Sequence, residues 1–131
     1  MSQENVEIVV TLMQDFNERK PWWELVDERI KWHSRPDEPD ATIHHGRKAV
    51  RDYIDGWDEM FPGYRIEPDG LPVDLGERVI FPARLVGVAR TTGLAVSEPY
   101  VFVCTVSESK IVLAREFGTE AEALKAVGLP E

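Results

Sequence analysis

Three segments in the first half of the chain carry apolar residues at the spacing of an α-helix. In the first segment, over residues 6–16, the apolar positions are Val6, Val9, Val10, Met13 and Phe16. Pro21 suits the first position of a second, short helix that carries the apolar residues of 22–26. A third helix is predicted up to Pro62, and its apolar face consists of Val50, Tyr53, Ile54, Trp57 and Phe61.

Strand patterns fill most of the remaining chain. Residues 29–34 alternate, so that Trp32 and Ser34 share one face and His33 lies on the other. Pro82 and Pro99 lie inside later apolar runs and indicate bulges or edge positions. Short polar links between these later runs imply antiparallel hairpins, and the runs are 64–67, 78–88, 95–107 and 110–117.

The order of these elements predicts the fold class. Segment 35–45 is predicted to be a loop because it holds two prolines and three acidic residues. Thr119 and Glu122 form a capping box, which predicts a final helix over 121–127. We expect a cone-shaped α+β barrel, in which a curved, mostly antiparallel sheet wraps around three helices and leaves a pocket at its open end. Because the sequence contains no internal repeat, we expect residues 1–131 to form a single domain.

Charge and cysteine content narrow the possible functions. The formal net charge is -9, which disfavours nucleic acid and anionic membrane surfaces as partners. Cys104 is the single cysteine, so an intramolecular disulfide and a zinc site built from cysteine pairs are both excluded. The acidic N-terminus does not resemble a signal peptide, and no apolar run reaches transmembrane length. We therefore expect a cytoplasmic protein.

Four short segments resemble the SnoaL-like branch of the nuclear-transport-factor-2-like superfamily, which includes ketosteroid isomerases and polyketide cyclases. They are Asp15-Phe16-Asn17, Trp32-His33-Ser34-Arg35-Pro36, Gly46-Arg47-Lys48-Ala49-Val50 and the stretch from Ser109 to Phe117. The resemblance covers nearly the whole chain and implies the cone-shaped fold. It also implies that the third helix and the first strand wall a cavity.

The same resemblance argues against steroid isomerisation. In the isomerases a base aspartate ends the first strand, and here Ser34 takes that position. The tyrosine and the protonated aspartate of the isomerase oxyanion hole, which is the standard example of a carboxylic acid kept neutral, correspond to Leu12 and Phe102. All three groups of the isomerase mechanism are therefore missing.

Glu116 and Arg84 are the first candidates for catalysis. Glu116 shares a strand face with Val112 and Ala114, and the resemblance turns this face toward the cavity. Desolvation there would raise the pKa of the carboxyl, which suits a general acid or base. Arg84 lies inside an apolar run and needs an anion, which is either a substrate oxyanion or Glu116 itself. In the second case the pair is a structural salt bridge.

His33 is a further candidate base, with Asp37 or Glu38 orienting its ring, although a surface or interface histidine is the favoured explanation of its position. His44 and His45 are adjacent, which is not the spacing of metal ligands, and we expect no metal and no cofactor. One of the loop acids could replace the missing base if the loop folds over the pocket. Candidate substrate-binding residues are Trp32, Ser34, Tyr53, Trp57, Phe61 and Phe102, of which the aromatic ones are also explained as core.

Two functions from different classes fit this sequence. The first is a lyase, isomerase or cyclase that acts by acid–base chemistry on a small hydrophobic carbonyl compound. The second is a ligand-binding or accessory module that uses the same pocket without turnover. The depth of Glu116 separates them, because a sealed carboxyl favours a structural role. A homodimer through the outer sheet face is also expected, because the long strands are apolar on both faces.

Overall fold

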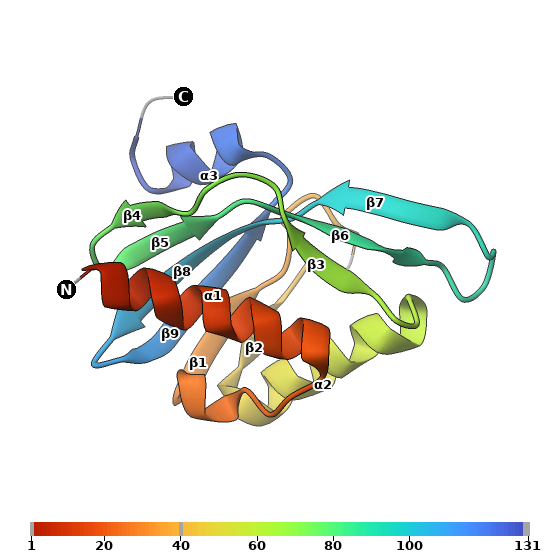
Figure 1. Ribbon diagram of the computed structural model, residues 1–131, viewed down its shortest axis with the longest axis horizontal. Coiled ribbons are helices and arrows are strands. Elements are labelled where there is room, and N and C mark those ends of the chain that lie inside the picture. The colour runs from red at the N-terminus through yellow and green to blue at the C-terminus, as the bar shows by residue number, and fades with distance from the viewer. Residues whose placement is uncertain (1, 40, 130–131) are drawn as a thin grey trace.

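A computed structural model describes residues 2–39 and 41–129, and Figure 1 shows the arrangement of their helices and strands. The helices are α1 (Ser2–Glu18), α2 (Gly46–Met60) and α3 (Glu120–Ala126), and a short 3₁₀ helix η1 (Trp23–Leu25) follows α1. The first strands in chain order are β1 (Val26–His33), β2 (Ile43–His45), β3 (Arg65–Pro68) and β4 (Val73–Leu75). The later strands are β5 (Arg78–Phe81), β6 (Ala83–Val88), β7 (Ala95–Pro99), β8 (Val101–Ser107) and β9 (Lys110–Phe117).

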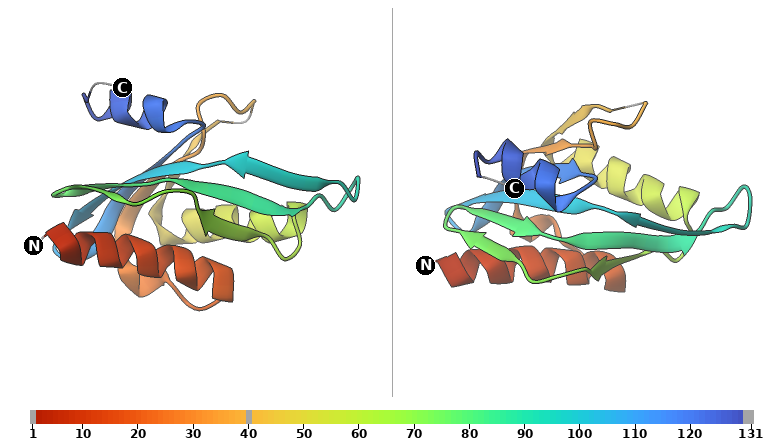
Figure 2. Two further views of the ribbon diagram at one scale, coloured as in Figure 1. Left: turned by 45° about the horizontal axis from the view of Figure 1, so that its top comes forward. Right: turned by 90° about the horizontal axis from the view of Figure 1, so that it is seen from above.

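The strands form two sheets. The larger sheet has the order β2-β1-β9-β8-β5-β4, and the smaller has the order β3-β6-β7. Strands β1 and β9 are parallel, and the other paired strands are antiparallel. Helices α1 and α2 lie on one side of the larger sheet and α3 lies on the other (Figure 2). The predicted α+β cone with a mostly antiparallel sheet is confirmed.

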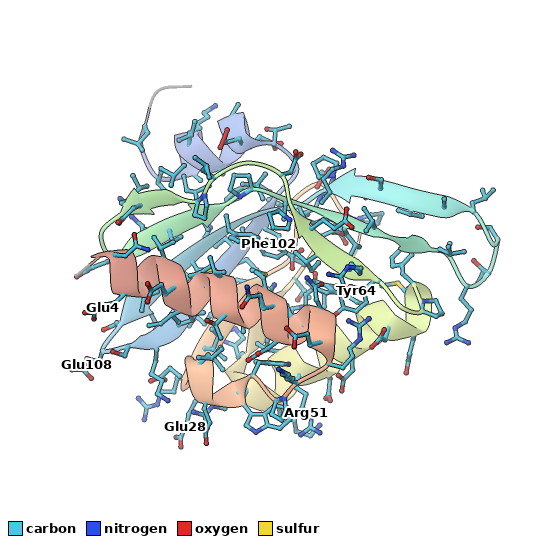
Figure 3. The ribbon with its side chains drawn as sticks, in the orientation of Figure 1. Glu4, Glu28, Arg51, Tyr64, Phe102 and Glu108 are labelled. Atoms are coloured by element: carbon cyan, nitrogen blue, oxygen red, sulfur yellow. The ribbon has the colours of Figure 1, made fainter. Side chains whose placement is uncertain are left out.

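The main core lies between the larger sheet and the two long helices. Phe102 of β8 is fully buried there and points from the sheet toward α1 (Figure 3). The buried residues that the two helices contribute are Val9, Leu12, Met13, Phe16, Val50, Ile54 and Trp57. A smaller cluster on the outer face joins Ala123 of α3 to the sheet residues Ile80, Val101, Val103 and Phe117. Helix α3 therefore covers part of the outer face, which explains why the long strands are apolar on both faces.

The predicted second helix is wrong in type and extent. Only Trp23–Leu25 is helical, as one 3₁₀ turn, and β1 begins at Val26 instead of residue 29. Val26 is fully buried and pairs with Ile111 of β9. Burial and pairing with β9 therefore place Val26 in the sheet, although the spacing of the tryptophans before it predicts a helix.

Two of the predicted strands are each divided between the two sheets. The run 78–88 breaks at Pro82 into β5 and β6, and the run 95–107 breaks at Tyr100 into β7 and β8. The amide of Tyr100 donates to the carbonyl of Ala83 at 2.9 Å, which ties the two breaks together. A proline has no amide hydrogen to donate, so the ladder is interrupted where Pro82 occurs.

The ends of the predicted loop and of the last helix also depend on short-range contacts. Segment 35–45 contains one strand that was not predicted, β2, which is three residues long. Ser34 closes the loop, because its hydroxyl accepts from the Thr42 amide at 2.9 Å and donates to the Thr42 carbonyl at 3.1 Å. The predicted cap of α3 is present, since the Thr119 hydroxyl accepts a hydrogen bond from the Glu122 amide at 3.1 Å.

Candidate functional site

The carboxyl of Glu116 lies at the centre of the main core, on the inner face of β9. Glu116 pairs with Phe102 of β8 and shares its face with Ala114, which pairs with Trp32 of β1. The residue is 1% exposed. The prediction that the side chain of Glu116 points inward is therefore borne out by its position, while its chemical role stays a prediction.

Two side chains donate hydrogen bonds to this carboxyl. The indole Nε1–H of Trp32 donates to Oε2 at 2.5 Å, and the hydroxyl of Tyr53 lies 2.9 Å from both carboxyl oxygens. Trp32 comes from β1 and Tyr53 from α2, so the site joins three elements that are far apart in the sequence. Among the described residues no cation pairs with Glu116.

Burial controls the protonation of Glu116. Desolvation raises the pKa of its carboxyl to about 8, and the negative charge of Glu38 adds to this effect. The hydrogen bonds from Trp32, Tyr53 and the Arg35 backbone act in the opposite direction because they stabilise the ionised form. The carboxyl is consequently neutral for the most part at pH 7, and a neutral carboxyl can donate a hydrogen bond or a proton.

A second carboxylate, that of Glu38, approaches the same region from the loop after β1. The hydroxyl of Tyr100 donates to Oε1 of Glu38 at 3.0 Å, and Tyr100 packs beside Phe102 with ring centroids 6.3 Å apart. Burial and the negative charges of Glu38 and Glu116 raise the pKa of Tyr100 far above its usual value. Glu38 is half-buried, so it is the more accessible of the two acids.

Arg35 fixes the loop that carries Glu38. Its guanidinium pairs with Asp37 at 2.7 Å and with Glu98 at 3.4 Å, and it donates to the carbonyl of Pro99 at 3.1 Å. The same group lies 5.0 Å above the ring of Tyr100. Arg35 therefore connects the loop to the end of β7 and to the tyrosine that bonds Glu38.

His44 covers the outer side of Tyr53. The two rings are stacked with centroids 4.1 Å apart and an interplanar angle of 22°. The Nε2 atom of His44 is buried and has no hydrogen-bond partner among the described residues. Burial lowers the pKa of His44, so its ring is neutral at pH 7.

The predicted pairing of Arg84 with Glu116 is wrong. Arg84 lies on β6 in the smaller sheet, where its guanidinium donates to the hydroxyl of Ser97 at 2.8 Å and to its carbonyl at 2.9 Å. Its side chain is 38% exposed, and Asp69 is 3.8 Å away. The break at Pro82 moves β6 out of the sheet that holds Glu116, which the uninterrupted apolar run did not indicate.

His33 and Ser34 also differ from their predicted roles. His33 lies on the opposite face from Glu116, beside Arg115, and neither candidate acid orients its ring. Asp37 pairs with Arg35, and Glu38 accepts from Tyr100. The hydroxyl of Ser34 is engaged with the Thr42 backbone, so it closes the loop.

The remaining aromatic candidates extend the wall around Tyr53. Trp57 is buried, with its ring 5.4 Å from Tyr53 and 6.2 Å from Tyr100. Phe61 is half-buried at the end of α2. Sequence reasoning missed Tyr100, because it occupies the break between β7 and β8, where strand alternation carries no information.

Two hollows accompany this site. One, of about 270 Å³, lies between the end of α1 and α2 and is lined by residues that include Phe16, Trp22 and Tyr64. The other, of about 220 Å³, lies beside the 35–42 loop, and its lining includes Ser34, Arg115 and Glu116. Within the described ranges, no group of three His, Cys, Asp or Glu side chains is arranged to hold a metal ion, and no helix is long and apolar enough to cross a membrane.

Comparisons with known proteins place this geometry in a family. A search of curated proteins gave no match. Bal32a, from a soil-derived mobile gene cassette, superposes with a TM-score of 0.80 at 21% identity, over 95% of this chain and 96% of that one. TerC, co-crystallised with polyporic acid, superposes with a TM-score of 0.75 at 13% identity, over 93% of this chain and 96% of that one.

A protein of ketosteroid isomerase-like fold from Catenulispora acidiphila DSM 44928, in complex with trimethylamine, superposes with a TM-score of 0.75 at 15% identity, covering 95% of this chain and 94% of that one. At these identities the structural likeness shows the fold alone. The sequence pattern of the SnoaL-like domain matches residues 13–114. The chain therefore belongs to the SnoaL-like domain family.

Proposed function

We propose that this protein binds a small hydrophobic carbonyl compound inside the cone and moves a proton on it, with Glu116 as the central acid–base group. The observation that carries the proposal is the burial of Glu116 without a cationic partner in the described part of the chain. A buried carboxyl of this kind destabilises a fold, and such groups concentrate at functional sites.

The two carboxyls suit different steps of one reaction. Neutral Glu116, together with the hydroxyl of Tyr53, would donate to the carbonyl oxygen. The carboxylate of Glu38 would take a proton from the carbon next to that carbonyl. The electron pair of the C–H bond would then move onto the oxygen as an enolate, and the proton would return at a different carbon or leave with a departing group. Pairs of titratable groups in contrasting environments are typical of acid–base catalysis.

The surrounding rings indicate the class of substrate. Trp32, Tyr53, Tyr100 and Phe102 present flat apolar surfaces around the two carboxyls. Such a wall suits a cyclic or conjugated compound. Polyporic acid on TerC and trimethylamine on the Catenulispora protein illustrate that proteins of this fold accept small organic molecules.

One observation favours the alternative, a binding module without turnover. Glu116 is only 1% exposed, so a ligand reaches it only if the site opens. If the site stays closed over Glu116, the carboxyl has a structural role and a ligand binds without being converted.

Hydrogen–deuterium exchange separates the two functions. The protein is incubated in D₂O with a cyclic enone, 2-cyclohexen-1-one, and with a hydroxyquinone, and deuterium on carbon is followed by mass spectrometry. We expect catalysed exchange that Glu116→Gln lowers by at least roughly 100-fold. Glu67→Gln, the same change on an exposed strand position, is the matched control and is expected to leave the rate unchanged.

The outcomes lead to distinct conclusions. A raised melting temperature with these probes but no exchange above the buffer rate supports the binding module. Neither exchange nor a change in melting temperature contradicts both functions for this class of compound.

A further inference from the structure

The outer face of the larger sheet carries an unusual group of basic side chains for a protein with a net charge of -9. Lys31 and His33 lie on this face of β1, opposite Trp32. Lys31 pairs with His45 of β2, and His33 pairs with Arg115 of β9. The four side chains therefore come together on three adjacent strands.

These four side chains lack acidic partners. Within residues 2–39 and 41–129, none of them makes a hydrogen bond or an ion pair through its side chain. The guanidinium of Arg115 is half-buried and lies 5.0 Å above the ring of Phe117. An arginine in this position retains donors for a planar anion.

A hollow of about 220 Å³ lies next to Arg115. His33 and Arg115 form its basic side, and its apolar side consists of Pro36, Ala41, Ile43 and Phe117. Ser34, Thr42 and Glu116 complete the lining. A cavity with a fixed cationic donor and an apolar wall is matched by a small molecule that carries one carboxylate and one compact apolar group.

We infer that this hollow is a binding site for a small organic monocarboxylate, held by Arg115 and bordered by Glu116. Arg115 binds the carboxylate, and His33 lies beside Arg115. Lys31 and His45, which pair with each other on β1 and β2, add positive potential that attracts the anion. The side chains of Arg115 and Glu116 point to opposite faces of β9, because the two residues are adjacent in the strand.

His33 supplies a readout that is specific to this face. Burial and the charges of Arg115, Lys31 and His45 lower the pKa of His33. A bound carboxylate adds a negative charge next to the ring, which favours the protonated form. Binding must therefore raise the pKa of His33, and by reciprocity the affinity must increase as pH falls through that pKa.

The test is a titration of the full chain with benzoate, followed by the NMR resonances of the histidine rings. We expect saturable binding, an upward shift of the His33 pKa and stronger binding at lower pH. Arg115→Gln is expected to weaken binding at least roughly tenfold, because it removes a charge-assisted hydrogen bond. Arg65→Gln, on an exposed position of β3 in the other sheet, is the matched control and should leave the affinity unchanged.

Two further measurements keep the result specific. Benzamide, which has the same shape without the charge, is expected not to shift the His33 resonances. Tyr53→Phe, which alters the carboxyl site at a residue outside the lining of the hollow, should leave benzoate binding intact, so failure of the acid–base function and failure of this site are distinguishable. The inference is overturned if benzoate leaves the pKa of His33 unchanged, if Arg115→Gln binds as tightly as the unsubstituted protein, or if benzamide binds equally well.

Discussion

Trp32 and Glu116 lie on neighbouring parallel strands, and the indole Nε1–H of Trp32 donates to Oε2 of Glu116 at 2.5 Å. This contact fixes one carboxyl oxygen on the inner face of the sheet, and the hydroxyl of Tyr53 approaches both oxygens from α2. Two elements thus position the carboxyl before any ligand arrives. Such preorganisation is useful for chemistry and also makes the stability of the fold depend on the protonation of Glu116.

Stability is expected to decrease as the pH rises from about 4.5 to about 8. The pKa of Glu116 is about 8 in the folded state, whereas its ordinary value of 4.5 applies to the unfolded chain. Between these two pH values the folded state therefore binds more protons than the unfolded state. Each pKa unit corresponds to about 1.4 kcal/mol, and the free energy of unfolding therefore falls by several kcal/mol at most. Urea unfolding at several pH values measures this dependence. Glu116→Gln should flatten it, and an equally steep dependence in the variant would contradict the assignment.

Tyr53→Phe is expected to destabilise the fold by about 1–2 kcal/mol above pH 8, where Glu116 is ionised, and by less at low pH. The variant removes one donor from a buried carboxyl and should also raise the pKa of Glu116 further. Tyr64→Phe is the control, because Tyr64 is a buried tyrosine whose hydroxyl makes no hydrogen bond within the described residues. Chemical denaturation at two pH values provides the comparison. An identical loss in both variants would count against the Tyr53–Glu116 bond.

Arg35→Gln is expected to cost about 1–2 kcal/mol of unfolding free energy and to increase amide exchange at Thr42. The change removes two ion pairs and the bond to the Pro99 carbonyl together. Lys48→Gln serves as the comparison, because it breaks one exposed pair with Asp52 and should cost less than about 0.5 kcal/mol. Equal effects of the two substitutions would show that Arg35 does not hold the loop.

A homodimer through the outer sheet face remains a prediction, and such a dimer would compete with a ligand bound beside Arg115 on the same face. Light scattering at micromolar concentration can test it. Because α3 covers one part of this face, Leu113 of β9 now marks the uncovered part, where it is half-buried and pairs with Lys31. Leu113→Lys should then convert the dimer to a monomer. Leu71→Lys, at a position that is 86% exposed, is the control. A monomeric unsubstituted protein would end this prediction.

The single-domain prediction for residues 1–131 also has a direct test. Both sheets share the crossing points at Pro82 and Tyr100, so we expect them to unfold together. Far-UV circular dichroism and tryptophan fluorescence should follow one coincident transition in urea. Two separate transitions would indicate independently folding parts.

The sequence predicted those features that depend on local spacing. The face of α2 that carries Tyr53 and Trp57 follows from helical periodicity, and the cap at Thr119 follows from the capping-box motif. The inward direction of Glu116 is implied by the family resemblance, and all three features agree with the structure. The opposite direction of His33 follows from strand alternation.

Contacts that cross a break in the pattern could not be predicted. The apolar run continues through Pro82, and it therefore predicted Arg84 in the same sheet as Glu116. In the structure the chain passes to the other sheet at Pro82. The contact of Glu38 with Tyr100 joins a loop to a strand break, and neither position has a periodicity that fixes its direction. The three-residue strands β2 and β4 are too short to show an alternation.

The breaks at Pro82 and Tyr100 also affect the tendency of this protein to aggregate. In the described part of the chain, the outermost strands of both sheets are β2, β4, β3 and β7, and none of them is longer than five residues. Strand β8 is paired on both sides, with β5 and β9, so only the five residues of β7 form the open edge of this hairpin. A short edge offers few unpaired amide and carbonyl groups to another chain, which limits edge-to-edge pairing far from the carboxyl site.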